Sequence, residues 1–375
     1  MALRQLDRQP GYAPVDMNRV PRLGQLLERI GTGPFEPDSV TAPVGRNDAW
    51  AGKTISGTKV FVKQLVGPER DVQQRMTRIL SFEEFSMRKG EAVTPSPRLL
   101  GTDADAGLIA FELIDDSRSG SDLMRDEEFT VALATEVGRL IGLLHAAEVP
   151  ADLAIDRSAP KLPPVDLLQG IPLEMFDKAS AGVLETWRIL QHDAELIDGV
   201  RRLRGWEADA PAVAAHCDFR LDQLLITDDG ALYLTDWEEF RITDAARDVG
   251  AFAGEWLYRS VLDIVTTRGD AGFAEFELTH ELVLQRGAEK MTRLLPLIEA
   301  FWTAYRRVRP VLDDQFTVRA TAFAGWHLLD RLLAGAEDAA RLSGISRAAA
   351  GVGRGALLAP DKFAAAIGFS FEEVQ

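Results

Sequence analysis

The sequence predicts an α+β protein with a small β-rich N-terminal lobe and a large, mainly helical C-terminal lobe. Between Val40 and about Ile114, short runs rich in β-branched and aromatic residues alternate with glycine turns, which is the pattern of a small twisted sheet. From Glu127 onward, apolar residues recur at the spacing of packed helices. A β-hairpin with an Asp-Asp-Gly turn at residues 228–230 interrupts this helical part.

The length and composition fit a two-lobed globular protein. The chain has 375 residues, of which 46% are hydrophobic and 27% are charged. This is enough to bury a large core divided between two lobes of one catalytic unit. We therefore assign residues 1–40 to an N-terminal accessory segment, residues 41–115 to an N-lobe and residues 116–375 to a helical C-lobe.

The accessory segment and the N-lobe are predicted to contain helices as well as strands. A helix from Arg22 to Ile30 ends at a Gly-Thr-Gly-Pro run. Strands follow around KTIS and KVFVKQL, with a turn at Gly57. A helix is predicted between Glu69 and Arg88, and the runs PSPRLLG and LIAFELI supply two more strands. The apolar face of that helix is predicted to carry Val72, Met76, Ile79, Leu80 and Phe82.

The C-lobe is predicted to be helical on both sides of the hairpin. A helix over residues 129–147 carries one apolar stripe, formed by Leu133, Val137, Leu140, Ile141 and Leu144. A proline-rich connection near residues 159–164 leads to helices that end at about Leu203. Further helices are predicted at residues 251–265, 290–307 and 316–336. Four tryptophans in apolar contexts are predicted to lie in the core, namely Trp237, Trp256, Trp302 and Trp326.

Charge and cysteine content indicate a cytoplasmic protein without a nucleic-acid or membrane partner. The formal net charge is −16, which argues against a nucleic-acid partner, because the negative phosphate backbone is bound by basic surfaces. An acidic surface would favour a cationic substrate, but the same charge is equally explained by a solvated surface that keeps the protein in solution. Cys217 is the single cysteine, so no internal disulfide forms, and no Cys/His cluster has zinc-site spacing. No run approaches the roughly 18 apolar residues of a membrane span, and the first residues lack the apolar core of a signal peptide.

The strongest functional signal is the segment from His216 to Asp248, HCDFRLDQLLITDDGALYLTDWEEFRITDAARD. Asp218 begins an irregular loop after an apolar run, and Asp236 ends the second strand of the hairpin. Phosphoryl transfer needs one carboxylate to orient the acceptor hydroxyl and another to hold the magnesium ion that bridges the nucleotide phosphates. The spacing of Asp218 and Asp236 allows that division of labour.

This segment resembles the catalytic segment of the aminoglycoside phosphotransferase and choline kinase families, which are distant relatives of protein kinases. Their segment reads H-G-D-x-x-x-x-N followed by a strand and D-W. The resemblance implies a bilobal protein-kinase-like fold with a nucleotide-binding N-lobe, and a C-lobe that holds the catalytic loop and the acceptor site. It also implies that ATP and Mg2+ are the cofactors.

By the same resemblance, Asp218 is the catalytic aspartate and Asp236 is the principal magnesium ligand. Gln223 stands at the position of the metal-binding asparagine, where its amide oxygen lies one methylene further from the backbone. The second departure is Cys217, which replaces the family glycine. His216 and Asp248 correspond to residues that brace the catalytic loop in the family. A structural role is also favoured for His145.

The N-lobe contributes the predicted phosphate contacts. Lys63 lies among alternating apolar residues on a strand, where a cation needs an anionic partner. It matches the kinase lysine that holds the α- and β-phosphates, and Glu83 or its rival Glu84 would form the orienting ion pair. The alternative is a solvent-facing lysine on an edge strand.

Two further N-lobe segments match the family's nucleotide contacts. The loop Gly45-Arg46-Asn47-Asp48-Ala49-Trp50-Ala51-Gly52 precedes the lysine strand, and its backbone N–H groups could approach phosphate. Asn47 is the candidate contact within it, and an ordinary hairpin is the alternative. Three residues end an apolar strand where family members bind adenine through backbone groups: Glu112, Leu113 and Ile114.

The acceptor is the open question within this chemistry. Arg220, two residues after Asp218, is predicted to contact the transferring phosphoryl group, and a surface pair with Asp222 is the alternative. The motifs GRNDAWAG, VFVKQL, HCDFRLDQLL and TDWEEF also resemble the kinase subunits of class V lanthipeptide synthetases.

That narrower resemblance implies phosphorylation of Ser or Thr in a ribosomal precursor peptide, before a separate phospholyase subunit eliminates the phosphate. The precursor peptide and the phospholyase are then the partners. A second hypothesis keeps the chemistry and makes the acceptor an aminoglycoside or another small alcohol. A third hypothesis, based on Gln223 and the altered glycine loop, is a catalytically degenerate kinase-like binding subunit.

Overall fold

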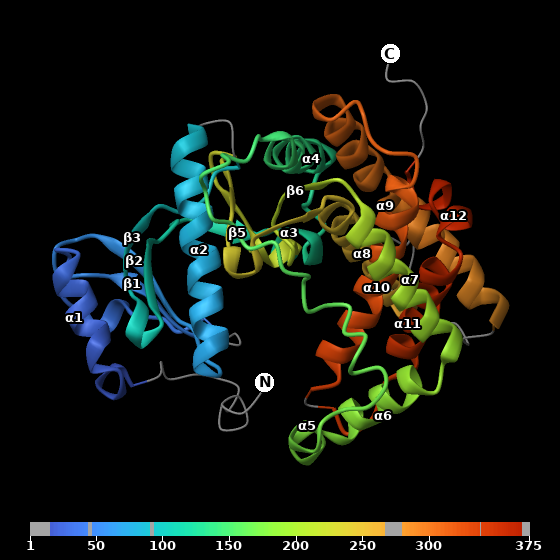
Figure 1. The fold of residues 1–375 in the computed structure, drawn as a ribbon, viewed down its shortest axis with the longest axis horizontal. Coiled ribbons are helices and arrows are strands. Elements are labelled where there is room, and N and C mark those ends of the chain that lie inside the picture. The colour runs from blue at the N-terminus through green and yellow to red at the C-terminus, as the bar shows by residue number, and fades with distance from the viewer. Residues whose placement is uncertain (1–15, 44–46, 91–93, 267–279, 338, 370–375) are drawn as a thin grey trace. The chain divides into compact units, whose positions relative to one another are not determined.

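The computed structural model describes residues 16–43, 47–90, 94–266, 280–337 and 339–369, apart from the side chains of Asn18 and residues 280–284. The chain divides into two compact units (Figure 1). The smaller unit comprises Met1–Arg125, Pro150–Ile155 and Asp222–Phe240. The larger unit comprises the remainder: Asp126–Val149, Asp156–Leu221 and Arg241–Gln375. The residues around Asp236, which we had assigned to the C-lobe, therefore group with the smaller unit.

The smaller unit contains the predicted sheet. Its four antiparallel strands run in the order β1-β2-β4-β3: β1 (Asp48–Lys53), β2 (Lys59–Gln64), β4 (Leu108–Glu112) and β3 (Leu99–Asp103). A second, three-stranded sheet joins the hairpin to a short strand that we had not predicted: β5 (Ser117–Ser119), β7 (Leu224–Thr227) and β8 (Leu232–Leu234). The helices of this unit are α1 (Pro21–Arg29), α2 (Glu69–Lys89) and α3 (Gly120–Arg125).

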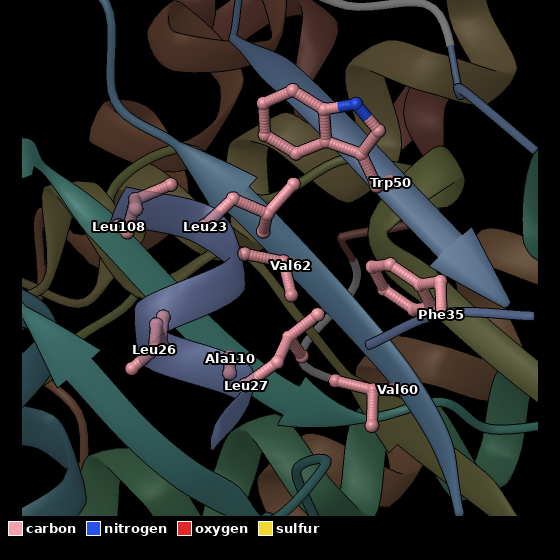
Figure 2. Close-up of a cluster of buried hydrophobic side chains, with 9 residues drawn as sticks. All are labelled: Leu23, Leu26, Leu27, Phe35, Trp50, Val60, Val62, Leu108 and Ala110. Carbon is pink, nitrogen blue, oxygen red and sulfur yellow. The ribbon is translucent and has the colours of Figure 1, made fainter. Parts of the chain in front are cut away.

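The two faces of the four-stranded sheet pack against different helices. One face and α1 form an apolar cluster (Figure 2) of Leu23, Leu26, Leu27, Phe35, Trp50, Val60, Val62, Leu108 and Ala110. Residues of opposite parity pack against α2, where Leu65 and Ile109 meet Met76 and Ile79. Side chains alternate between the faces of a strand, so Lys63 of β2 belongs to the α2 face.

The predicted helix over residues 69–88 is confirmed, but one of its core residues was assigned wrongly. Leu80 is 38% exposed, whereas Phe82 and Phe85 are fully buried. At about 100° per residue, Leu80 lies beyond Met76 at the edge of the buried arc. The arc extends in the other direction to Arg75 and Arg78, which are also buried. Periodicity of apolar residues alone therefore misplaces this arc, because part of it is polar.

The larger unit is mainly helical, as predicted. Its helices are α4 (Val131–Ala146), α5 (Leu173–Lys178), α6 (Ala181–Gln191), α7 (Ala194–Asp209), α8 (Ala246–Leu262), α9 (His280–Val308), α10 (Phe316–Gly335), α11 (Gly344–Leu358) and α12 (Pro360–Phe363). Two strands that we had not identified, β6 (Ala212–Ala215) and β9 (Arg241–Asp244), pair antiparallel in the same unit. No helix of the described residues is long and apolar enough to cross a membrane.

Close helix packing in the larger unit depends on two glycines. A Cβ atom at Gly138 of α4 would lie 2.1 Å from the backbone oxygen of Phe301 in α9. A Cβ atom at Gly250 of α8 would lie 2.3 Å from the backbone oxygen of Ala320 in α10. The helices touch backbone to backbone at these points, so a side chain would force them apart. The four tryptophans predicted to lie in the core are all buried, with at most 5% exposure.

Candidate active site

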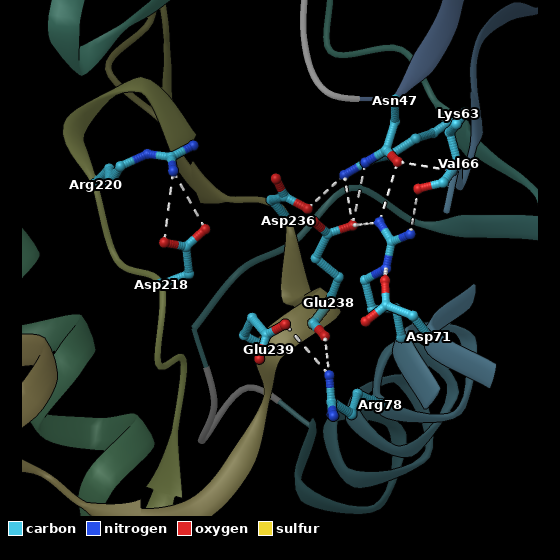
Figure 3. Close-up of polar contacts among 11 residues, drawn as sticks. Asn47, Lys63, Val66, Asp71, Arg78, Asp218, Arg220, Asp236, Glu238 and Glu239 are labelled. Atoms are coloured by element: carbon cyan, nitrogen blue, oxygen red, sulfur yellow. Dashed lines mark hydrogen bonds and ion pairs between the residues drawn. The ribbon is translucent and has the colours of Figure 1, made fainter. Parts of the chain in front are cut away.

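Lys63 is held between two carboxylates in the smaller unit. Its Nζ atom lies 2.6 Å from Oδ1 of Asp236 and 3.3 Å from Oε2 of Glu238 (Figure 3). Burial alone would lower the pKa of the Lys63 ammonium, but the charges of Asp236 and Glu238 outweigh it and raise the pKa above its usual value. The edge-strand alternative is therefore wrong, because the lysine is charged, paired and only 14% exposed.

Asp236 stands at an abrupt turn that aims its carboxylate. Its φ of 69° is in the left-handed region, which Asp and Asn tolerate better than most residues. The next residue, Trp237, begins a short 3-10 helix, η6 (Trp237–Glu239), and its ring stacks on Phe82 of α2 with the centroids 3.5 Å apart. The indole N–H donates to the Leu234 carbonyl and the Ser96 hydroxyl, each at 3.1 Å. The buried tryptophan thus anchors the turn that presents the carboxylate.

Glu238 joins Asn47, the residue before strand β1, to helix α2. Its Oε2 atom accepts a hydrogen bond from the Asn47 amide at 3.3 Å and lies 3.4 Å from the guanidinium of Arg75. Arg75 also donates to the Asn47 side-chain oxygen at 3.1 Å and to the Val66 carbonyl at 2.7 Å. Sequence reasoning missed Arg75 and Glu238. The available signal was the position of Arg75 on the same helical stripe as Phe82.

The predicted ion pair of Lys63 with helix α2 is not formed in this structure. Glu84 pairs with Arg88 instead. Oε1 of Glu83 is buried and has no hydrogen-bond partner among the described residues. Glu83 lies about 20° from Met76 and about 40° from Ile79 around the helix, on the face that packs against the sheet. Burial raises the pKa of the Glu83 carboxyl to about 7.

The predicted glycine loop is largely a strand. Residues 48–52 belong to β1, which forms an antiparallel hairpin with β2, so the hairpin alternative describes this part. Gly52 allows close approach to another backbone, because a Cβ there would lie 2.9 Å from the Ser39 carbonyl oxygen. Gly45 and Arg46 lie outside the described residues. Asn47 is buried, and its Oδ1 accepts the Val66 N–H at 3.0 Å, so its side chain organises the protein in this structure.

The segment predicted to bind adenine, residues 112–114, begins with the last residue of strand β4. Glu112 is the last residue of that strand, and its side chain pairs with Arg98 at 3.4 Å. The Leu113 N–H donates to the Lys59 carbonyl at 3.2 Å, and the Ile114 carbonyl accepts from the Ser117 hydroxyl at 3.0 Å. These bonds fix the backbone of the segment at the end of the sheet.

The smaller unit also holds Gln223, which is 3% exposed. Its backbone carbonyl accepts from both the N–H and the hydroxyl of Thr235, so it is tied to the residue before Asp236. The Asp236 carboxylate and the Gln223 side-chain amide carry oxygen ligands of the type that Mg2+ binds. Mg2+ is usually held by one or two carboxylates together with substrate phosphates. Within the described ranges, no group of three or more His, Cys, Asp or Glu side chains could hold a metal ion.

The loop that follows strand β6 in the larger unit is braced by Asp248. The carboxylate of Asp248 accepts the N–H of His216 at 2.7 Å and the N–H of Cys217 at 2.9 Å. It also lies 3.0 Å from Nε2 of His145, whose Nδ1 is 3.0 Å from the Tyr305 hydroxyl. Burial alone would raise the pKa of the Asp248 carboxyl, but the bonds and charge from His145 and His216 hold it below its usual range. These contacts are those expected of a loop brace.

The same loop presents Asp218 and Arg220. Cys217 has a φ of 70°, the left-handed conformation that explains a glycine at the matching family position. A guanidinium nitrogen of Arg220 lies 3.3 Å and 3.5 Å from the two carboxylate oxygens of Asp218 (Figure 3). Both side chains are partly exposed, at 24% for Arg220 and 33% for Asp218.

Residues 69–310 match a family described as the phosphotransferase enzyme family, APH. The chain belongs to this family. The matched range begins at helix α2 and covers Asp218, Gln223, Asp236 and Asp248, whereas Lys63 precedes it. This APH-family chain is therefore an ATP-dependent phosphotransferase.

Solved structures resemble this phosphotransferase in fold. One is the amicoumacin kinase hAmiN in complex with AMP-PNP, Ca2+ and Ami, with 15% identity, a TM-score of 0.52 and coverage of 93% of this chain and 94% of the other. Another is a macrolide 2'-phosphotransferase type I, with 16% identity, a TM-score of 0.50 and coverage of 88% of this chain and 100% of the other. These likenesses support the predicted bilobal kinase-like fold. No curated protein sequence matches the chain.

Proposed function

We propose that this enzyme transfers the terminal phosphoryl group of ATP, bound with Mg2+, to a hydroxyl group. The observation that carries the proposal is the partly buried Lys63 ammonium, 2.6 Å from the Asp236 carboxylate. A charged lysine and a carboxylate at this distance supply one group for phosphate oxygens and one for a divalent ion. Phosphoryl transfer is catalysed mainly by such alignment and charge placement.

The roles of the other residues follow from this chemistry. Asp218 orients the acceptor hydroxyl, and Arg220, beside it, contacts the transferring phosphoryl group. Gln223 assists Asp236 with the metal. The amicoumacin kinase structure, which contains AMP-PNP and Ca2+, supports a nucleotide with a divalent ion. Bound Mg2+ would neutralise phosphate charge and bridge the phosphates.

Adenine is proposed to bind along residues 112–114. The Leu113 N–H and the Ile114 carbonyl are engaged within the protein. The Leu113 carbonyl and the Ile114 N–H belong to one trans peptide group and point in opposite directions, so only one of these two groups can face the purine.

Two acceptors are proposed for the same chemistry. The motif resemblance to lanthipeptide synthetase kinase subunits favours Ser or Thr in a precursor peptide, with a phospholyase partner acting next. The exposed Leu173 and Phe176 of α5, in the insertion between α4 and α7, would suit contact with a peptide side chain. A small-molecule hydroxyl is favoured by the similarity in fold to an amicoumacin kinase and a macrolide 2'-phosphotransferase.

The decisive experiment supplies both kinds of acceptor to the full chain. The enzyme is incubated with γ-labelled ATP and Mg2+, together with the precursor peptide encoded beside its gene, or with panels of aminoglycosides and macrolides. Label on Ser or Thr of the peptide supports the peptide acceptor, and label on the drugs alone ends that proposal. If no acceptor is labelled under conditions in which ATP binds, the hydroxyl-transfer proposal is contradicted for these substrates.

A further inference from the structure

Two carboxylates share Lys63, and they differ in their surroundings. Asp236 is 24% exposed, and the proposed function assigns it to the metal. Glu238 is 8% exposed, and the proposed function does not assign it to the nucleotide or the metal. Both belong to the same compact unit as Lys63 and helix α2. The distances to Nζ, 2.6 Å and 3.3 Å, place both anions against one ammonium.

Lys63 cannot keep both partners equally once Asp236 binds a divalent ion. A divalent ion on Asp236 would add a second positive charge to a carboxylate whose Oδ1 lies 2.6 Å from the Lys63 Nζ, and the ion and the ammonium would repel each other. Glu238 is then the carboxylate that stays within ion-pair distance of Lys63. The helix α2 candidates do not fill this place, because Glu84 pairs with Arg88 and Glu83 makes no ion pair in the described structure.

Glu238 is held firmly enough to orient a lysine. The Asn47 amide and the Arg75 guanidinium both contact the same Glu238 oxygen as Lys63 does, at 3.3 Å and 3.4 Å. Arg75 is fully buried and is fixed in turn by Asp71 at 3.0 Å and by the Val66 carbonyl at 2.7 Å. A carboxylate locked by a buried cation and a buried amide is pre-organised, so little side-chain entropy is lost on pairing.

We propose that Glu238 is the positioning residue that orients Lys63 toward the nucleotide, in the role that kinases give to a glutamate of the helix after the lysine strand. The inference rests on the proposed function of Lys63. Arg75 and Asn47 hold Glu238 in place, so the orienting contact comes from the segment after Asp236, and helix α2 contributes through Arg75. Glu83 is not required for it.

The pairing is tested first on Lys63 itself, without nucleotide. The variant Asp236→Asn leaves Glu238 as the charged partner, and the double variant Asp236→Asn/Glu238→Gln leaves none. Acylation of Lys63 is followed by mass spectrometry from pH 7 to 11. An opposite charge within reach shifts a pKa by one or more units, so loss of the Glu238 charge should lower the pKa of Lys63. At a pH below that pKa, Lys63 of the double variant should therefore be acylated about tenfold faster than Lys63 of Asp236→Asn. Equal profiles for the two proteins would overturn the pairing.

The orienting role is tested next by nucleotide affinity, with Glu83→Gln and Glu84→Gln as matched controls on α2. Glu238→Gln should weaken Mg2+–ATP binding about tenfold in calorimetry, and each control should change it less than about twofold. Loss of affinity in Glu83→Gln with none in Glu238→Gln would overturn the inference. If Lys63 acylation responds to Glu238 but Lys63→Met binds nucleotide normally, the pairing stands and the proposed function of Lys63 fails.

Glu238→Asp and Arg75→Met distinguish orientation from folding. Glu238→Asp keeps the charge but shortens the reach. In the Asp236→Asn background it should therefore give a Lys63 acylation rate between that of Asp236→Asn alone and that of the double variant. Arg75→Met releases Glu238 while leaving its charge, so it should weaken nucleotide binding less than Glu238→Gln does. Native-like circular dichroism is required of each variant, and a folded Glu238→Gln protein with wild-type affinity counts against the inference.

Discussion

Replacing Asp248 should destabilise the protein more than the removal of any single exposed ion pair would. This carboxylate is fully buried and accepts three hydrogen bonds, from the N–H groups of His216 and Cys217 and from Nε2 of His145. Nε2 is the donor, because an ionised carboxylate has no proton to give. Asp248→Ala would therefore leave three buried donors without their acceptor.

The magnitude follows from these three donors. Each buried donor left without an acceptor costs about 1–3 kcal/mol, so three donors cost about 3–9 kcal/mol before the structure relaxes. Two effects reduce this sum: water can enter the space, and the variant no longer bears the cost of burying a carboxylate. For comparison, breaking a buried ion pair typically costs about 3–5 kcal/mol. We expect about 4 kcal/mol for Asp248→Ala, and about half of that for Asp248→Asn, whose amide oxygen still accepts. A domain stable by about 5–15 kcal/mol would still fold at room temperature.

Urea unfolding at pH 7, followed by tryptophan fluorescence, measures this loss. The matched control is Asp198→Ala, since Asp198 forms an exposed pair with Arg201 on α7. Removing such a pair should change the unfolding free energy by less than about 1 kcal/mol. An Asp248→Ala protein as stable as the Asp198→Ala control would refute the account of the loop brace.

Acidification should act on the same network. The folded state lowers the pKa of the Asp248 carboxyl and, through burial, the pKa of the His145 imidazole. Both groups then bind fewer protons when folded, so their stabilising contribution is present above the unfolded pKa and is lost as pH falls. For His145 the loss begins below about pH 6.5, and for Asp248 below about pH 4. In Asp248→Asn the acid limb assigned to Asp248 should disappear.

Three further outcomes are expected. Asp218→Asn should bind ATP normally but lose turnover by at least about a hundredfold. Asp236→Ala should lose turnover and also weaken Mg2+–nucleotide binding in calorimetry. Normal turnover of Asp218→Asn would overturn the catalytic assignment of Asp218. Glu83→Gln should gain stability relative to wild type as pH rises from about 4.5 to about 7, since over that range the folded wild-type carboxyl keeps its proton while the unfolded one loses it; parallel pH curves from urea unfolding would contradict this. Cys217→Gly should be more stable than Cys217→Ala by about 1 kcal/mol, because the position is left-handed; the opposite order in the same assay would reject that explanation.

Local pattern was sufficient for most of the fold. The helix of residues 69–88, the hairpin with its Asp-Asp-Gly turn and helices α8, α9 and α10 were predicted from periodicity and turn residues, whereas α11 and α12 were not. Strand β9 was missed because Arg241–Asp244 has no apolar alternation; it is defined by pairing with β6, about 30 residues earlier. Pairing at such a separation leaves no local signature in the sequence.

The candidate site was predictable where one residue carries the chemistry, and less so where partners had to be chosen. Lys63 and Asp236 were identified singly, yet their direct contact spans 173 positions and was not foreseen. Glu83 was chosen as the partner of Lys63 because of its place on the next helix. It instead follows Met76 and Ile79 onto the apolar face. A buried Arg75 was not anticipated, because arginine is rarely buried without partners. Asp71 lies four residues away on the same helix, but the other carboxylate partner, Glu238, lies 163 positions away.

The short segment from Asp236 to Phe240 couples the charged site to the core of the smaller unit. Asp236 and Glu238 face Lys63, while Trp237 stacks on Phe82 and Phe240 meets Phe82 edge-on at 5.4 Å. Aromatic contacts of this kind are specific in geometry. Loss of the Phe82 ring would therefore disturb the carboxylates as well as the packing. The same segment thereby contacts helix α2 and carries the two anions around Lys63.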